Sequence, residues 1–312
     1  MPVPEALKGR LKAPIVAAPM FLTSGPDLVA ETCNAGLLGT FPALNQRTTE
    51  GFRDWLHQIR DRLAPEAAPF GVNLIVHRSN PRVQADLQVC IEEKVPLIIT
   101  SLGAVPELVA AVQGYGGLVF HDVVNARHAR KAAEAGVDGI IAVAAGAGGH
   151  AGSLSPFALV AEIREIFAGA ILLGGALNTG AQVAAARMLG ADLAYLGTRF
   201  LATAEAMVPE AQKRMVLDSV AADILYTAKV SGVPASFLRQ SLAAAGIDPE
   251  GATPHMDMQS EAKAWKDVWS AGQGVGGIRD LPAARDLCAR LIAEYRAALS
   301  GAEPAARAEG WL

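Results

Sequence analysis

Cysteine is scarce in this chain of 312 residues, which contains only Cys33, Cys90 and Cys288. The three lie far apart and none belongs to a Cys-x-x-Cys pair. This spacing argues against both a disulfide framework and a zinc knuckle. We therefore expect a protein of the reducing cytoplasm that holds no metal ion.

Long hydrophobic runs are missing as well. No segment reaches the roughly 18 uncharged apolar residues that a membrane-spanning helix requires. The first residues, Met-Pro-Val-Pro-Glu-Ala-Leu-Lys, lack the apolar core of a signal peptide. We expect the chain to be neither secreted nor embedded in a membrane.

Positive charge does not gather in any one place. The net charge is −4 and the Lys and Arg residues are scattered, so there is no basic stripe of the kind that binds a phosphate backbone. Nucleic acid is therefore not an expected partner. Aromatic residues make up only 5% of the chain while Ala, Gly and Val are abundant, which favours helices packed closely on a parallel sheet.

Eight short apolar runs alternate with stretches of helical periodicity. The runs are Ile15–Ala18, Leu37–Phe41, Phe70–Ile75, Leu97–Thr100, Leu118–His121, Gly139–Ala144, Ala170–Leu173 and Leu193–Leu196. The helical stretches are Asp27–Ala35, Thr49–Leu63, Pro81–Lys94, Pro106–Gln113, Ala126–Ala135, Pro156–Phe167 and Gly180–Leu189. Gly36, Gly136 and Gly190 stand where helices of this kind end. Eight such βα units within about 200 residues favour an α/β fold, a closed (β/α)8 TIM barrel; an open doubly wound sheet is the alternative.

The alternation stops after Leu201. Residues 205–222 and 237–245 have helical character, 246–259 is rich in turn formers, and a Trp-bearing segment covers 262–270. A final amphipathic stretch follows at 281–300. We expect a barrel made of residues 1–204 and 278–300, a smaller helical lid at 205–277 over the barrel mouth, and a loosely ordered tail at 301–312.

Glycine and a single titratable side chain come together after the sixth apolar run. Gly146, Gly148, Gly149 and Gly152 surround His150, so a ligand can approach the backbone closely. A histidine exchanges protons near neutral pH, and TIM barrels carry their chemistry at this end of the strands. We therefore predict that His150 is catalytic; the alternative is a loop histidine bonded to backbone groups.

The same loop also matches the dinucleotide fingerprint G-x-G-x-x-[GA]. That fingerprint belongs to the first βα turn of a Rossmann unit, whereas this loop follows the sixth run. We therefore do not assign it to dinucleotide binding.

Two glycine pairs follow the seventh and eighth runs. Leu173-Gly-Gly-Ala176 and Gly197-Thr198 stand where barrels commonly bind a phosphate through backbone N–H groups. Asn73 is a polar residue within an apolar run, either a strand-end cap or a hydrogen-bonding group for a heterocycle. We expect a β-branched side chain at Gly197 to displace a bound phosphate.

The motifs together resemble a known family. They are Ala18-Pro-Met20, Gly71-Val-Asn73, Ala147-Gly-Gly-His-Ala-Gly152, Gly174-Gly-Ala176, Gly197-Thr-Arg-Phe-Leu-Ala-Thr203 and Trp269-Ser-Ala-Gly-Gln-Gly-Val-Gly276. In this order, from about residue 14 to 300, the chain resembles the FMN-dependent nitronate monooxygenases, formerly called 2-nitropropane dioxygenases. The superfamily also contains flavin-dependent enoyl-acyl-carrier-protein reductases and NADH:quinone reductases, which these motifs do not separate.

The resemblance implies a site for FMN across the barrel mouth. It places the backbone of Ala18, Pro19 and Met20, together with Asn73, near the isoalloxazine, and Gly174, Gly175, Ala176, Gly197 and Thr198 on the phosphate. His150 takes the position of the family's catalytic histidine, with Gly149 beside it at the cofactor, and Gln273 points toward the flavin region. Some relatives have a Lys where this chain has Asp122, directly after His121.

The implied reaction is FMN-dependent oxidation of alkyl nitronates, and of nitroalkanes, with O2, which gives a carbonyl compound and nitrite. The expected partners are a small-molecule substrate and O2, and a homodimer is also expected. One alternative is an NAD(P)H-dependent flavin reductase of quinones or enoyl thioesters. Another is a non-catalytic binder of flavin or phospho-ligands.

Overall fold

The computed structural model describes residues 3–230, 232–248, 251 and 267–308. Eight parallel strands close into a barrel in the order β1-β2-β3-β4-β5-β6-β8-β9. Their bounds are β1 Ile15–Ala17, β2 Leu38–Pro42, β3 Gly71–Ile75, β4 Leu97–Ser101, β5 Leu118–Val123, β6 Gly139–Val143, β8 Ala170–Gly174 and β9 Leu193–Leu196. Each predicted apolar run forms one of these strands, so the TIM barrel is confirmed.

The barrel interior is filled with side chains. The inward-facing positions hold Val16, Leu38, Leu97, Ile99, Phe120, Ile141, Leu172 and Leu193, all fully buried. Alternate residues such as Ile98, Val119, Ile140 and Ile171 face the surrounding helices instead. Because both faces of each strand are covered, the strands have the continuous apolar sequences typical of parallel sheets.

One α-helix lies between each pair of consecutive barrel strands in the described part of the chain. These helices are α1 Pro26–Asn34, α2 Thr49–Arg62, α3 Val83–Glu92, α4 Pro106–Gln113, α5 Ala126–Glu134, α6 Pro156–Ile166 and α7 Gly180–Met188. Side chains cap several N-termini, and Asn125 accepts a hydrogen bond from the His128 amide. After α1, α5 and α7 the backbone adopts a positive φ at Gly36, Gly136 and Gly190, which confirms their placement at helix ends.

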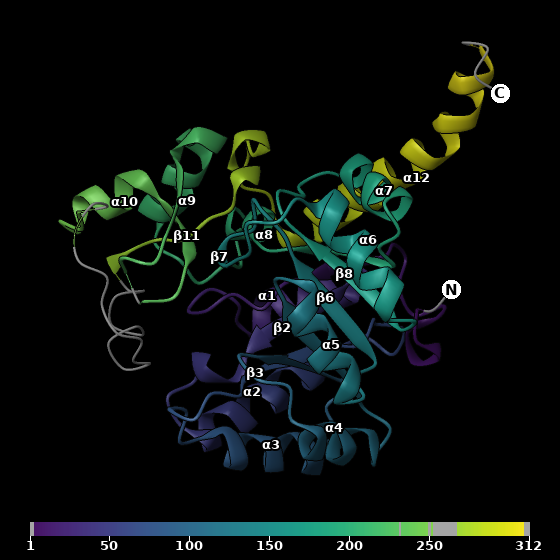
Figure 1. Ribbon diagram of the computed structural model, residues 1–312, viewed down its shortest axis with the longest axis vertical. Helices are drawn as coiled ribbons and strands as arrows, with labels where there is room; N and C mark the ends of the chain where they lie inside the picture. The colour runs from purple at the N-terminus through teal and green to yellow at the C-terminus, as the bar shows by residue number, and fades with distance from the viewer. Residues whose placement is uncertain (1–2, 231, 249–250, 252–266, 309–312) are drawn as a thin grey trace.

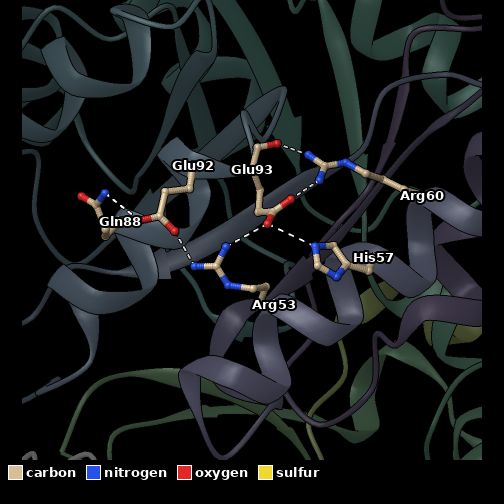
Figure 2. Close-up of polar contacts among 6 residues, drawn as sticks. All are labelled: Arg53, His57, Arg60, Gln88, Glu92 and Glu93. Carbon is tan, nitrogen blue, oxygen red and sulfur yellow. Dashed lines mark hydrogen bonds and ion pairs between the residues drawn. The ribbon is translucent and has the colours of Figure 1, made fainter.

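A polar cluster joins α2 to the end of α3 on the outside of the barrel (Figure 2). Its members are Arg53, His57, Arg60, Gln88, Glu92 and Glu93. The Glu93 carboxylate accepts hydrogen bonds from Arg53, His57 and Arg60. Burial opposes ionisation of Glu93, but these bonds from His57, Arg60 and Arg53 lower the pKa of its carboxyl. The cluster contains several candidate acid–base groups, yet their charges are used to hold two helices together.

A second, three-stranded sheet stands beside the barrel mouth. It contains β7 Gly149–His150, β10 Ile224–Thr227 and β11 Ala235–Leu238 in the order β10-β11-β7. Short helices accompany it: α8 Thr198–Leu201, α9 Glu210–Asp218, α10 Arg239–Ala244 and the 3-10 helix η4 Gln273–Gly277. Figure 1 shows α9, α10 and β11 grouped on one side of the molecule.

The segment that we expected to be a helical lid therefore also contains strands. β11 pairs with β7, which lies far away in the sequence, and local periodicity does not reveal such a partner. The predicted turn-rich stretch at 246–259 and the Trp-bearing segment at 262–270 lie largely outside the described residues. The division between barrel and lid stays a proposal.

The C-terminal helix is longer than expected. Helix α12, Ala284–Ala308, packs against α7 and α1 through Leu287, Cys288 and Leu291, and its last turns project from the body of the molecule (Figure 1). We expected a loosely ordered tail from residue 301, but 301–308 continue the helix, including Pro304. Ala, Glu and Arg are strong helix formers, and Arg307 pairs with Glu303 one turn earlier at 2.7 Å.

Two expectations from the composition can be compared with the structure. Cys33, Cys90 and Cys288 are buried free thiols, as the absence of a disulfide framework predicts. Within the described part of the chain, no helix is both long and apolar enough to span a membrane.

Candidate active site

A cleft of about 1080 Å³ opens at the carboxyl ends of the barrel strands. The predicted site residues that line it are Ala18, Pro19, Met20, Asn73, Gly149, His150, Gly174, Gly175, Ala176, Gly197 and Thr198. They come from loops that are far apart in the sequence. The fold brings them together because parallel strands in a closed barrel all end on the same rim.

Gln273 is the predicted residue that does not line this cleft. Its neighbours Ala271 and Gly274 do, whereas the Gln273 side chain is exposed. The backbone N–H of Gln273 donates a hydrogen bond of 2.9 Å to the Gly146 carbonyl. Gln273 therefore joins η4 to the histidine loop, and its predicted approach to the flavin is untested.

The loop after β1 is held in place by two polar residues that the sequence analysis did not identify. The Asn45 amide donates hydrogen bonds to the carbonyls of Met20 and Ser24, and its oxygen accepts one from the Leu22 amide. The Ser24 hydroxyl accepts a further bond from the Met20 amide. These bonds fix the backbone of 18–24 against the rim, with Leu22 at a φ of 58°.

His150 is fixed by strand pairing. It lies on β7 opposite Ala235 of β11. The Ser270 hydroxyl accepts a hydrogen bond from the Gly149 amide and donates one to the Ser236 carbonyl, both at 2.7 Å. The imidazole is thus carried on a short, cross-braced strand and lines the cleft, which is a better-defined position than a free loop provides.

The glycines around His150 are required by close backbone packing. A Cβ on Gly148 would lie 2.8 Å from the Gly272 amide nitrogen, and one on Gly272 would lie 2.5 Å from the Gly146 carbonyl oxygen. Real Cβ atoms do not come this close to backbone atoms. The Gly272 amide also donates to the Thr198 hydroxyl at 2.8 Å. The histidine loop, the loop before η4 and the start of α8 therefore form one packed unit.

The two predicted phosphate-binding turns differ in backbone conformation. Gly175 has a φ of +145° and Ala176 a φ of +55°, so this turn uses the left-handed region at two successive residues. Gly197 has a φ of −101°, which other residues also adopt. A Cβ on Gly197 would meet only Ala18 and Met20, at 3.7 Å or more. Gly197 is therefore not needed for its backbone angle, and a side chain there would enter the cleft.

Inward-facing positions near the carboxyl ends of β3, β4 and β5 are polar. The Asn73 amide donates to the Ser101 hydroxyl at 2.8 Å, and that hydroxyl donates to Asp122 Oδ2 at 2.5 Å. Burial raises the pKa of Asp122 to about 6, against lowering contributions from the Ser101 bond and the charge of His150. The sequence placed Asn73 in the site, but the Ser101 link depends on the register between β4 and β5 and was missed.

His121 and Tyr195 also line the cleft. Burial, and the nearby charge of His128, lower the pKa of His121 to about 4, and its Nδ1 lies 2.7 Å from the Thr100 hydroxyl. Burial, and then the charge of Asp122, raise the pKa of Tyr195 well above its usual value. Both side chains are therefore neutral near pH 7. Within the described residues, no group of three or more His, Cys, Asp or Glu side chains could hold a metal ion.

The sequence model of the nitronate monooxygenase family matches residues 5–294. The chain belongs to the nitronate monooxygenase family. Members of this family are FMN-dependent, so the chain is an FMN-dependent oxidoreductase.

Relatives that are similar to this chain in sequence carry the names of different enzymes. The nitronate monooxygenase of Paraburkholderia phytofirmans is 29% identical over 91% of this chain and 92% of its own length. A 5-hydroxy-7a-methyl-1-oxo-octahydro-1H-indene-4-carboxyl-CoA dehydrogenase of Rhodococcus jostii is 31% identical over 73% of this chain and 63% of its own length.

Solved structures confirm the fold. A nitroalkane oxidase of Streptomyces ansochromogenes superposes with a TM-score of 0.82 at 27% identity, over 95% of this chain and 99% of that one. FabK of Thermotoga maritima gives a TM-score of 0.82 at 24% identity, over 99% and 98%. At that identity, FabK supports the fold alone.

The residues of the cleft fit the family's cofactor. The volume suits a ligand of this size, the turn at Gly174–Ala176 exposes backbone through positive φ angles, and Gly197 leaves room where a side chain would project. The Thr198 hydroxyl accepts a bond from the Gly272 amide, so its own proton remains for an anion. Together these features provide backbone and hydroxyl donors for a phosphate.

Proposed function

We propose that this chain oxidises nitroalkanes and their nitronates with O2 in an FMN-dependent reaction that yields a carbonyl compound and nitrite. The observation that carries the proposal is the cross-braced His150 in the cleft of a chain that matches the nitronate monooxygenase family over residues 5–294. The relatives named nitronate monooxygenase and nitroalkane oxidase support it.

His150 acts as the base of the proposed reaction. Its ring accepts the acidic proton from the carbon beside the nitro group, a role in which positioned histidines are common. The strand pairing of β7 and the Ser270 bonds keep the ring at the cleft wall, so little motion is needed before proton transfer. When bound, FMN accepts the electrons that the oxidation releases.

The Gly174–Ala176 turn, Gly197 and Thr198 bind the phosphate of FMN in this proposal, while Ala18–Met20 and Asn73 border the ring system. The Asn45 and Ser24 bonds support this arrangement because they hold the 18–24 backbone rigid. Rigid supporting contacts keep the reactive atom of a cofactor correctly placed relative to the substrate.

A second candidate function is an NAD(P)H-dependent reductase of enoyl thioesters or quinones. The relative named as a carboxyl-CoA dehydrogenase, 31% identical over 73% of this chain, favours it. In that case His150 would orient or protonate an acceptor instead of removing a proton.

The two candidate functions differ in which compound reduces the flavin. It is the nitro compound in the first and NAD(P)H in the second, and only the first couples oxygen uptake to nitrite release. Protein reconstituted with FMN is supplied separately with nitroethane, ethyl nitronate and NADH in an oxygen electrode, and nitrite is measured in parallel. We expect oxygen uptake with nitrite release for the nitro compounds and only slow uptake with NADH. Rapid anaerobic bleaching of the flavin by NADH, with no nitrite from either nitro compound, would instead establish the reductase.

A further inference from the structure

Asp122 occupies an unusual position for a carboxylate. It is the last inward-facing residue of β5, two positions beyond the buried Phe120, and it lines the same cleft as His150. Its Oδ2 accepts the Ser101 hydrogen bond at 2.5 Å. Its Oδ1 is buried and has no hydrogen-bond partner within the described residues. A buried acceptor left in this way is costly unless a ligand or a proton satisfies it.

The hydrogen bonds around Asp122 all run in one direction. Asn73 donates to Ser101, and Ser101 donates to Asp122. Both amide hydrogens of Asn73 are used, because it also donates to the Ile99 carbonyl at 3.1 Å. This series of hydrogen bonds therefore ends at a carboxylate whose Oδ1 is buried, on a residue that lines the cleft.

The other titratable groups around the cleft identify what can change charge with pH. They are His121 on the same strand, His128 and Lys131 on α5, His150 on β7, Tyr195 on β9 and Tyr226 on β10. His121, whose pKa is about 4, and the two tyrosines, whose pKa values are raised, are neutral near pH 7. The Asp122 carboxyl, with a pKa of about 6, changes charge near pH 6, and burial lowers the pKa of His128.

We propose that Asp122 sets the charge selectivity of the site: its carboxylate disfavours an anion beside His150 and favours a neutral substrate from which His150 then takes a proton. This inference rests on the proposed function and specifies the form of its substrate. It follows from the place of Asp122 and His150 in the lining of one cleft and from the effect of the His150 charge on the pKa of Asp122, since any ligand held by His150 lies in the same field.

The total charge in the site differs between a bound neutral nitroalkane and a bound nitronate anion. With a neutral nitroalkane, the C–H bond breaks, its electron pair moves into the nitro group and the proton goes to a ring nitrogen of His150. The total charge of Asp122, His150 and substrate stays at one negative unit. A nitronate that enters as an anion beside neutral His150 brings this total to two negative units. Two like charges several Å apart at a partly buried site repel strongly.

Anion binding should weaken as the pH rises. Below the Asp122 pKa of about 6 the carboxyl is protonated and does not repel an anion; above it the repulsion is present. The Ser101 bond lowers that pKa, so its removal should shift the change to higher pH. The affinity for a neutral ligand should change neither with the ionisation of Asp122 nor with the loss of the Ser101 bond.

The test compares butanoate with butanamide, which have the same heavy-atom shape and differ in charge, as a nitronate differs from a nitroalkane. Dissociation constants are measured by calorimetry on the FMN-loaded protein from about pH 5 to 8 and are referred to the ionised fraction of butanoate, which falls toward the acidic end of this range. For the wild type, we expect butanoate binding to weaken as pH rises through about 6, and butanamide binding to stay level.

Two variants isolate Asp122. Asp122→Asn keeps the shape and the Ser101 bond, and it should bind butanoate about tenfold more tightly than wild type at neutral pH. Ser101→Ala should move the wild-type midpoint upward. His150 and His128 are present in every variant, so the part of the pH dependence that Asp122→Asn removes and Ser101→Ala moves upward reports Asp122.

Identical butanoate profiles in wild type and Asp122→Asn would overturn the proposal. If Asp122→Asn fails to fold or to hold FMN, an unmoved midpoint in Ser101→Ala would overturn it equally. Binding by calorimetry does not depend on oxygen uptake or nitrite. Charge selectivity without nitro oxidation would thus refute the proposed function alone, and nitro oxidation without charge selectivity would refute this inference alone.

Discussion

At the scale of single residues, Gly197 and Gly175 both border the expected phosphate position, but for different physical reasons. Gly175 has a φ of +145°, and a Cβ there would lie 2.8 Å from the Ala145 carbonyl oxygen. Gly197 has an ordinary φ of −101°, and a Cβ there would make only ordinary contacts, at 3.7 Å or more. The first glycine is needed by the fold, and the second only by a ligand.

This difference gives a prediction. Gly197→Val should retain the circular dichroism spectrum of the wild type and, compared without FMN, its melting temperature, but lose most of its FMN, because its methyl groups enter the expected phosphate position. Gly175→Val is the matched control and should lose about 1–3 kcal/mol of unfolding free energy from backbone strain as well. Native FMN content in Gly197→Val would remove Gly197 from the cofactor site.

Which site residues could be anticipated from sequence depends on how they reach the cleft. Residues directly after strand signals, such as His150, Gly174 and Gly197, could be predicted because all strand ends meet on one rim. Asp122 was noticed only as a departure from the family. Its bond to Ser101 and the bracing of Met20 by Asn45 depend on strand register and loop contacts, which one sequence does not encode in any local pattern.

At the scale of elements, the barrel strands were predictable and the second sheet was not. The barrel strands carry apolar, β-branched runs bounded by turn residues, a strong local signal. β7 has only two residues, Gly149 and His150, and exists because β11 pairs with it. The continuation of α12 through 301–308 was missed because the expectation of a tail followed only from the place of these residues at the end of the chain.

The two hydrogen bonds of Ser270 hold the short β7 strand in place, which gives a testable prediction. Ser270→Ala removes the acceptor of the Gly149 amide and the donor to the Ser236 carbonyl, which should cost about 1–3 kcal/mol locally. We expect faster hydrogen exchange at Gly149 and a lower kcat on nitroethane, with FMN content unchanged because the proposed phosphate-binding turns follow β8 and β9.

Tyr226→Phe is the control for this brace. It removes one hydrogen bond, from a half-exposed hydroxyl to the Ala151 carbonyl, and should have a smaller effect on both readouts. Exchange at Gly149 that is the same in Ser270→Ala and wild type would show that Ser270 does not hold the histidine strand.

At the scale of the whole molecule, the closed barrel supplies the rim and the second sheet supplies the histidine. The two parts meet where β11 pairs with β7 and where η4 packs on the histidine loop. The chain as a whole therefore has to be folded for the proposed chemistry, although the boundary between barrel and lid was drawn from sequence and is still a proposal. The expected homodimer and cytoplasmic location also stay predictions.

The central claim is that this assembly brings a base, His150, to a neutral nitro compound. The most direct test is His150→Ala, assayed with nitroethane and with ethyl nitronate at one fixed pH and equal FMN content. We predict that kcat/KM falls by about 10²- to 10⁴-fold on nitroethane, the usual contribution of a positioned general base. The loss on ethyl nitronate should be much smaller, because its proton has already been removed. Equal losses on the two substrates, or no loss on either, would contradict the claim.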